Sequence, residues 1–394
     1  MNKGSFKTGI EVFCYKKIYK NYQKAKIALL THQGAVTSDF KLSYQIFKEL
    51  FGNRLLYLFS PQHGLFSEKQ ANMIGSPDEV EPLFGISVKS LYGPRLSPDP
   101  DDLKRIDVIF IDLQEVGCRV YTYIWTLYLL LKVANDLKKE VVILDRPNPL
   151  GGIVEGPILE REYFSFVGLD SLPMRHGLTI GEIALLFKKR HFSELSLQVI
   201  PMENYLRDKL FPYYGRPWIL PSPNLPSFDC AFVYPGMVLL EGTNLSEGRG
   251  TTLPFLIFGA PYLKFKETYE LLLENFPSES WGVRFKPHAF EPTFDKWQGK
   301  RCFGFQIFVE NYSIFKPVSF ALKLLKLIRN SHKEFTFLEG PYEYEEKKKP
   351  IEILIGNKRV IDWLFGDEKG PLEHLLMEGL NFYLQEIDSV KLYR

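Results

Sequence analysis

The 394-residue sequence has few cysteines and no long hydrophobic run. Its four cysteines, Cys14, Cys118, Cys230 and Cys302, are far apart and form no Cys-x-x-Cys pair, so neither a disulfide framework nor a zinc site is expected. The basic N-terminus lacks the apolar core of a secretory signal, and no apolar stretch approaches membrane-spanning length. We therefore expect free thiols, no membrane contact and a cytoplasmic location.

Patterns for nucleotide or serine chemistry are also missing. There is no G-x-G-x-x-G after the first predicted strand and no G-x-x-x-x-G-K-[ST]. No G-x-S-x-G elbow marks a serine nucleophile, although Ser222 and Ser246 lie in loops of functional character. The 49 basic and 47 acidic residues are well mixed, which gives no electrostatic footprint for nucleic acid. We expect no cofactor, no metal centre and no nucleic-acid partner.

What the sequence has in quantity is apolar and aromatic residues, with 45% hydrophobic residues, enough for sizeable cores. Short apolar runs alternate with segments of helical spacing in the first half; the runs are residues 27–30, 55–59, 88–91, 108–111 and 141–144. Such continuous runs are typical of parallel strands buried on both faces. The sequence predicts an α/β fold whose N-terminal domain has a Rossmann-like, open and mostly parallel sheet.

The pattern changes beyond a proline-rich passage at residues 216–229, which we interpret as a domain boundary or a wall of the site. Helical and strand spacing between residues 265 and 328 predicts a smaller α+β domain. The chain length also exceeds that of a usual single domain. We predict domains at 1–220 and 221–394, with an active-site cleft between them.

The segment from Tyr234 to Phe255 concentrates chemically capable groups in a stretch with little helical or strand periodicity. Glu241, Asn244, Glu247 and Arg249 combine carboxylates, an amide and a guanidinium, which suit a polyhydroxylated or charged small molecule. Polar segments also follow most predicted strands of the first half, and they should meet outside the carboxyl ends of those strands.

The carboxylates in these segments outnumber what a neutral binding site needs; they are Glu68, Asp112, Glu115, Asp145, Glu155, Glu241 and Glu247. Paired carboxyl groups suit glycoside hydrolysis, in which one gives a proton to the leaving oxygen and the other supports the oxocarbenium-like centre or activates water. Glu115 is the first candidate for the acid because Arg119 lies nearby in sequence. Glu68 or Glu241 is the second carboxylate, whereas Asp112 and Asp145 equally suit helix capping.

Two histidines and an arginine add to the candidate site. His63, beside Gln62, suits contact with a sugar hydroxyl or proton transfer near neutral pH, and a structural role is the alternative. His176 has the same two interpretations. Arg175 precedes a helix predicted to begin with a capping box at Thr179, so an anion subsite is plausible there.

Several motifs occur in order along the chain: SPQHG, SLYG, IDLQEVGCRVYTY, LDRPNPLGG, MRHGLTIGE, PSPNLP and LLEGTNLSEGRGTT. Together they resemble the exo-β-N-acetylmuramidase family, long catalogued as a domain of unknown function, from about Ile27 to Val309. The resemblance implies an exo-acting glycosidase that removes N-acetylmuramic acid from the non-reducing ends of peptidoglycan fragments. It also implies a Rossmann-like N-terminal domain and a smaller C-terminal domain flanking the cleft.

Much of that family reads PEHG, whereas this chain matches a PQHG branch and carries an amide at Gln62. The motifs suggest substrate-binding roles for ten residues: Gln62, Arg119, Tyr121, Asp145, Arg175, His176, Asn224, Asn244, Glu247 and Arg249. The candidates for the lactyl carboxylate of muramic acid are Arg119, Arg175 and Arg249, because guanidinium groups bind carboxylates with two parallel bonds.

Three functions stay open at this point. The first is a glycosidase of cell-wall turnover or recycling that acts on MurNAc-GlcNAc fragments, with catalytic residues among Glu115, Glu68, Glu241 and His63, or with the substrate's 2-acetamido group as nucleophile. The second is a non-catalytic muropeptide or amino-sugar binding protein, since Gln62 cannot act as an acid. The third is a glycosidase for a related glycan.

Overall fold

A computed structural model describes residues 5–70 and 73–394. The strands are β1 (Ile27–Thr31), β2 (Leu55–Ser60), β3 (Glu79–Val80), β4 (Ser87–Ser90), β5 (Val108–Asp112), β6 (Glu140–Leu144), β7 (Val154–Ile158), β8 (Pro173–His176), β9 (Ser196–Ile200), β10 (Ile257–Ala260), β11 (Val283–Phe290) and β12 (Cys302–Val309). Within the described residues they form a seven-stranded sheet in the order β3-β4-β2-β1-β5-β6-β9, a three-stranded sheet and a two-stranded one.

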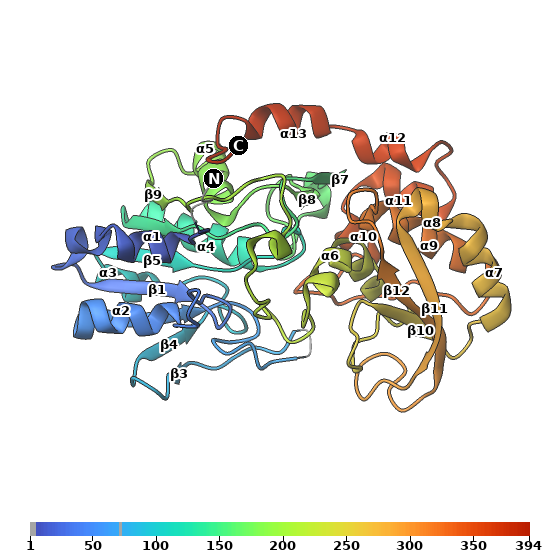
Figure 1. Ribbon diagram of the computed structural model, residues 1–394, viewed down its shortest axis with the longest axis horizontal. Coiled ribbons are helices and arrows are strands. Elements are labelled where there is room, and N and C mark those ends of the chain that lie inside the picture. The colour runs from blue at the N-terminus through green and yellow to red at the C-terminus, as the bar shows by residue number, and fades with distance from the viewer. Residues whose placement is uncertain (1–4, 71–72) are drawn as a thin grey trace.

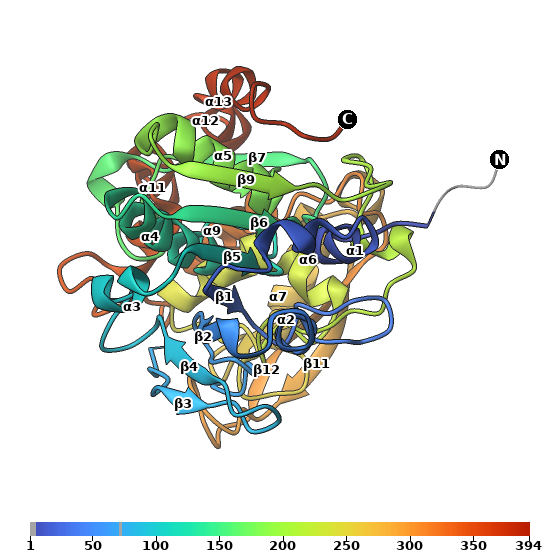
Figure 2. The same ribbon diagram turned by 90° about the vertical axis from the view of Figure 1, so that its left-hand side faces the viewer.

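The helices are α1 (Gly9–Tyr15), α2 (Ser43–Phe51), α3 (Pro100–Lys104), α4 (Tyr123–Asp136), α5 (Ile180–His191), α6 (Phe228–Met237), α7 (Phe265–Asn275), α8 (Ser278–Trp281), α9 (Pro317–Ser331), α10 (Pro350–Ile355), α11 (Lys358–Phe365), α12 (Leu372–Met377) and α13 (Leu380–Ile387). Figure 2 shows α1 and α2 on one face of the large sheet and α4 and α5 on the other. Among the described helices, none combines the length and apolarity needed to cross a membrane.

The large sheet buries both faces, as its continuous apolar strands predict. In β1, Ile27 and Leu29 pack into the cluster with α1 and α2, while Ala28 and Leu30 pack into the larger cluster with α4 and α5. Neighbouring strands pair in parallel except for β3 with β4. This order is that of a doubly wound, Rossmann-like sheet, so the predicted α/β fold is confirmed. Its switch point lies between β1 and β5.

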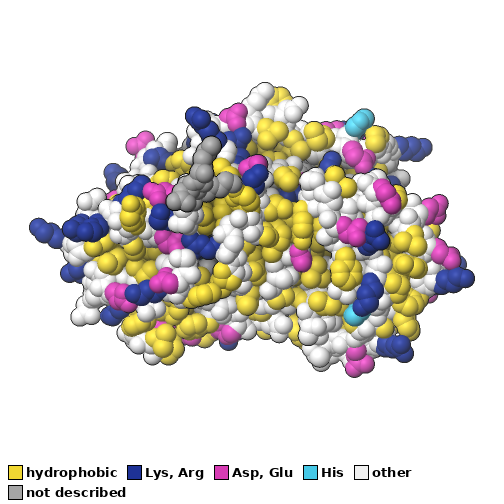
Figure 3. Space-filling view, viewed as in Figure 1, with side chains coloured by type: hydrophobic (Ala, Val, Ile, Leu, Met, Phe, Trp, Pro, Cys, Tyr) yellow, Lys and Arg dark blue, Asp and Glu magenta, His cyan; other side chains and the backbone are white. Residues whose placement is uncertain are grey.

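The second half of the chain forms the smaller part of the molecule (Figure 1), as the sequence predicts. Strands β10, β12 and β11 form an antiparallel sheet, and α6 packs on α9 beside it. The domain boundary at 220/221 stays a prediction. On the face shown in Figure 3, basic and acidic side chains lie interspersed over both halves.

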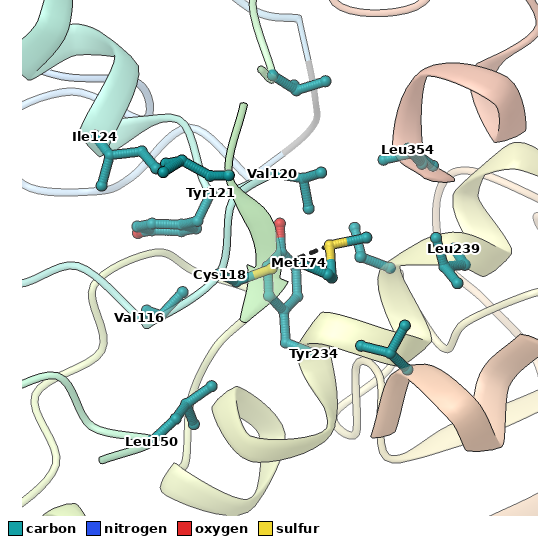
Figure 4. Close-up of a cluster of buried hydrophobic side chains, with 14 of the residues drawn as sticks. Val116, Cys118, Val120, Tyr121, Ile124, Leu150, Met174, Tyr234, Leu239 and Leu354 are labelled. Carbon is teal, nitrogen blue, oxygen red and sulfur yellow. Dashed lines mark hydrogen bonds between the residues drawn. The ribbon is translucent and has the colours of Figure 1, made fainter. Parts of the chain in front are cut away.

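One hydrophobic cluster runs through both halves and joins them. Figure 4 shows Val116 and Leu150 from the first half in the same cluster as Leu239 and Leu354 from the second. Burial of apolar surface is the main favourable term in such packing. The two halves therefore share a core, and the position of side chains at their junction is fixed.

The C-terminal segment returns to the first half (Figure 1). The Tyr393 hydroxyl donates to Asp145 Oδ2 at 2.5 Å, and the Tyr383 hydroxyl donates to the His176 carbonyl oxygen at 2.7 Å. Arg190 of α5 pairs with Glu386 of α13. Side chains between Tyr383 and Tyr393 thus bind the first half of the molecule beside the large sheet.

Candidate active site

A pocket lies at the junction of the two halves, outside the carboxyl ends of β2 and β5. It contains about 420 Å³ of empty space, open solvent included. Six of the residues predicted from sequence line it: Gln62, His63, Tyr121, Asn224, Glu241 and Arg249. The proline-rich passage supplies one wall through Ser222, Asn224 and Leu225, as predicted.

The segment after α6 places Glu241 and Arg249 in the pocket. Sequence reasoning expected little regular structure from Tyr234 onward, but α6 extends to Met237 and a 3₁₀ helix follows at Val238–Gly242. This helical part shows no amphipathic period because its residues from Cys230 to Gly242 are buried on every side. Beyond it, Gly248 and Gly250 flank Arg249 with φ of 83° and 77°, a conformation that favours glycine.

Glu241 is a buried carboxylate held in its ionised form. Arg249 donates from Nη2 and Nε to Glu241 Oε1 at 2.6 and 3.2 Å, and the Tyr342 hydroxyl donates to Oε2 at 2.7 Å. Burial by itself raises the pKa of Glu241, but the Arg249 guanidinium and the Tyr342 hydroxyl outweigh it and hold the pKa below its ordinary value. The pocket therefore contains an ionised carboxylate that Arg249 and Tyr342 hold in place.

Glu247 lies behind this pair and outside the pocket lining. Its Oε1 is 3.4 Å from Arg249 Nε, and its Oε2 is 2.6 Å from Lys296 Nζ. Burial raises the pKa of Glu247, with Lys296 acting in the opposite direction. Two carboxylates and two cations thus balance in this buried cluster, and Arg249 Nη1 is left without a hydrogen-bond partner in the described structure.

A second carboxyl group, from Glu343, lines the pocket and was not predicted from sequence. It accepts from the Tyr92 hydroxyl at 2.8 Å through Oε2 and from the Gln62 amide at 3.2 Å through Oε1. Burial raises the pKa of Glu343 to about 7, although both hydrogen bonds act in the opposite direction. Two carboxyl groups with pKa values pushed apart are the arrangement that separates acid from base.

Gln62 and His63 follow β2 and form the wall opposite Glu241. The Thr122 hydroxyl donates to Gln62 Oε1 at 2.5 Å, which leaves the amide nitrogen to donate to Glu343. His63 Nδ1 lies 2.7 Å from the Lys69 carbonyl oxygen, to which it donates. Burial lowers the pKa of His63 to about 4, so its ring is neutral at pH 7 and Nε2 accepts hydrogen bonds.

Glu115, the first candidate for the acid, lies outside the pocket lining. Its side chain is 1% exposed, accepts a hydrogen bond from the Gly117 backbone and lies 3.3 Å from His176 Nε2. His176 is itself fully buried, with Nδ1 accepting from the Leu178 backbone at 3.2 Å. The structure buries both residues and neither lines the pocket.

Arg119 and Arg175 are also buried and line no part of this pocket. The Arg119 guanidinium donates to four backbone carbonyls, those of Pro157, Leu172, Leu354 and Ile355. Arg175 pairs with Glu155 at 3.4 Å, and Glu155 in turn accepts from the first backbone amides of α9. These two arginines join the halves of the molecule.

Three further predicted residues lie away from the pocket. Asp145 accepts hydrogen bonds from Thr179 Oγ1 and from the Gly181 backbone, each at 2.8 Å. It therefore caps α5, which is the alternative role that the sequence suggests for it. Burial raises the pKa of Asp145 to about 7. Glu68 is exposed near Lys69. Asn244 bonds to the Thr336 backbone and the Tyr262 hydroxyl.

Comparison with known proteins places this geometry in a family. Residues 27–229 match the model for "Exo-beta-N-acetylmuramidase NamZ, N-terminal", and residues 232–393 match the C-terminal model of the same family. The chain belongs to the NamZ family. It is 41% identical over 342 residues to a peptidoglycan β-N-acetylmuramidase NamZ from Bacillus subtilis strain 168, covering 85% of this chain and 80% of that protein.

Solved structures give the same result for the fold. A DUF1343 family protein from Bacteroides fragilis NCTC 9343 matches with a TM-score of 0.85 at 25% identity, covering 99% of both chains. A second DUF1343 family protein from the same organism matches with a TM-score of 0.75 at 25% identity and the same coverage. The chain thus shares its overall architecture, second half included, with these structures.

Proposed function

We propose that this protein is an exo-β-N-acetylmuramidase, a glycosidase that releases N-acetylmuramic acid from the non-reducing ends of peptidoglycan fragments. Membership of the NamZ family supports the reaction type. The observation that carries the proposal is the junction pocket, in which the ionised Glu241 and the carboxyl group of Glu343 line one recess. Paired carboxyl groups are the usual equipment for glycoside hydrolysis.

In this proposal Glu241 is the charged carboxylate that supports the oxocarbenium-like centre. The substrate ring contacts Gln62, His63, Tyr121 and Asn224, which line the pocket around it. His63 accepts a sugar hydroxyl through its neutral ring, as its lowered pKa allows. The first substrate we propose is MurNAc-GlcNAc.

The test is hydrolysis of chromogenic β-N-acetylmuramide and β-N-acetylglucosaminide side by side by the purified protein. We expect aglycone release from the muramide and little from the glucosaminide. Binding of N-acetylmuramic acid by calorimetry without any hydrolysis would instead support the binding-protein alternative. Preference for the glucosaminide would point to a related glycan as substrate.

Arg249 is the residue we assign to the lactyl carboxylate of muramic acid. It lines the pocket, and its Nη1 has no hydrogen-bond partner in the described structure. Because a hydrogen bond between charged groups is worth about 1.5–3 kcal/mol, Arg249→Lys should weaken muramic acid relative to N-acetylglucosamine by about 10- to 100-fold. The measurement is the ratio of the inhibition constants of the two free sugars.

Arg175 provides the matched control for this selectivity test. It is an equally buried arginine, but its guanidinium pairs with Glu155 beneath the site. Arg175→Lys should leave the ratio of the two inhibition constants unchanged. A drop in that ratio for Arg175→Lys, with none for Arg249→Lys, would transfer the anion subsite to Arg175.

We further propose a role in cell-wall turnover or recycling inside the cell. The cysteines of the described chain are free thiols, which suits a reducing compartment. Subcellular fractionation with an antibody to the protein tests this location, and recovery from the medium would contradict it.

A further inference from the structure

A glycosidase needs a proton donor near the leaving oxygen, and the pocket offers few groups for that task. Apart from tyrosines, the titratable groups lining it among the described residues are His63, Glu241, Arg249 and Glu343. Arginine does not give up its proton in proteins. The lowered pKa values of His63 and Glu241 leave both without an acidic proton near pH 7. Glu343 remains.

The carboxyl group of Glu343 is held in one orientation. Its side chain is buried, and each of its oxygens accepts one hydrogen bond, from Tyr92 or from Gln62. Each oxygen keeps a second position for a proton. The backbone is also unusual, because Glu343 and Tyr344 have φ of 45° and 67°. Residues other than glycine rarely adopt this left-handed backbone conformation, and such strained residues are common at functional sites.

Gln62 is fixed so that it presents a donor to Glu343. Its Oε1 accepts the Thr122 hydroxyl at 2.5 Å, and its Nε2 donates to Glu343 Oε1 at 3.2 Å. A glutamate at position 62 would offer no such donor when ionised. The amide of Gln62 therefore allows the carboxyl group of Glu343 to lie beside it, whereas a carboxylate at position 62 would repel that group.

We propose that Glu343 is the catalytic acid that protonates the leaving oxygen, and that Gln62 is a positioning residue that orients its carboxyl group; this inference rests on the proposed glycosidase function. As the bond from the anomeric carbon to the leaving oxygen breaks, its electron pair stays on that oxygen, which takes the Glu343 proton. Water supplies the hydroxyl group that ends on the anomeric carbon. The remaining proton of that water restores the protonated Glu343.

The groups around Glu343 determine the pH range in which its carboxyl group is protonated and can act as the acid. The titratable groups that face it are Tyr92, Tyr234, Tyr342, Tyr344, Glu241 and Arg249. Glu241 and Arg249 act on its pKa in opposite directions, and burial is the dominant cause of the rise. Because the acid must be protonated, hydrolysis should fall as the pH rises through about 7.

The experiment compares two leaving groups in the full-length Glu343→Gln protein. With MurNAc-GlcNAc, whose leaving sugar hydroxyl needs a proton, kcat/KM should fall about 10²–10⁴-fold. With 2,4-dinitrophenyl β-N-acetylmuramide, whose leaving phenolate needs none, the fall should stay within about 10-fold. Glu346→Gln, the same substitution at an exposed glutamate three positions on, should change neither value.

A second variant tests the role of Gln62 through the pH profile. Gln62→Glu places a like charge beside Glu343, which raises the pKa of the acid. The alkaline limb of kcat/KM for MurNAc-GlcNAc should therefore move upward by about one pH unit or more. A loss of rate with an unmoved limb would show that Gln62 does not act through Glu343.

The outcomes separate this inference from the proposed function. If Glu343→Gln lost kcat/KM equally on both substrates, or on neither, the acid role of Glu343 would be overturned. The muramidase function would still stand, provided that the wild-type protein hydrolyses the muramides. Wild-type protein that cleaves neither muramide would remove the proposed function and the acid role together. A loss of kcat/KM in Glu343→Gln that is confined to MurNAc-GlcNAc would support both the muramidase function and the acid role.

Discussion

Replacing Glu241 by glutamine is expected to lower kcat for muramide hydrolysis by about 10²–10³-fold, with a smaller change in KM. The carboxylate is ionised, and Arg249 and Tyr342 hold it in place before substrate arrives. The neutral amide keeps the shape but cannot balance positive charge at the anomeric carbon. Steady-state kinetics on the chromogenic muramide measure the effect.

Glu68→Gln is the informative comparison, because the sequence leaves Glu68 and Glu241 as alternatives for the second carboxylate. Glu68 is exposed and lies outside the pocket lining. We expect its variant to keep kcat close to the wild-type value, because the side chain lines no part of the pocket. If Glu68→Gln were as impaired as Glu241→Gln, the assignment of the charge to Glu241 would have to be abandoned.

Arg119→Met is expected to lower the free energy of unfolding by about 3 kcal/mol or more. The guanidinium donates to carbonyls from both halves of the chain, including those of Leu354 and Ile355 at the end of α10. Removing it leaves buried carbonyl groups without partners, each of which costs about 1–3 kcal/mol. Burial lowers the pKa of Arg119 to about 10, so the charge persists at neutral pH. Thermal and urea unfolding measure the loss.

Arg161→Met serves as the control, since Arg161 is exposed. Its effect on stability should lie within about 0.5 kcal/mol. An Arg119→Met protein of wild-type stability that had lost its preference for muramic acid would instead make Arg119 a substrate-binding residue, as its motif suggests.

The large sheet is predictable because its strands are marked by local composition. Residues 27–30 and 141–144 are uninterrupted apolar runs, and the structure has strands there, β1 and β6. The capping box predicted at Thr179 is present and begins α5. Strand β7, by contrast, has the sequence VEGPI, in which glycine, proline and a carboxylate hide any strand pattern. It forms because β8 and the second half pack against it.

The site is predictable only in part, because its members come from distant segments. His63 follows a strand and Glu241 lies in a glycine-rich stretch, and both signals are local. Glu343 is 281 positions from Gln62, its hydrogen-bond partner, and stands beside the charged run 345–349 that suggests a solvated loop. Spacing near Glu115 could not tell whether its side chain lines the pocket or packs inside the protein, and the structure buries it outside the pocket lining.

The hydrogen bond from Tyr393 to Asp145 bears on how the chain is made. Asp145 directly follows β6, and its buried carboxyl group accepts a hydrogen bond from the Tyr393 hydroxyl, 248 positions later in the chain. A ribosome releases the Rossmann-like half long before it has synthesised that tyrosine. Until then a buried acid lacks one of its donors, and α5 lacks the packing of α13. During synthesis, the first half of the chain therefore lacks these contacts until Tyr393 and α13 have been made.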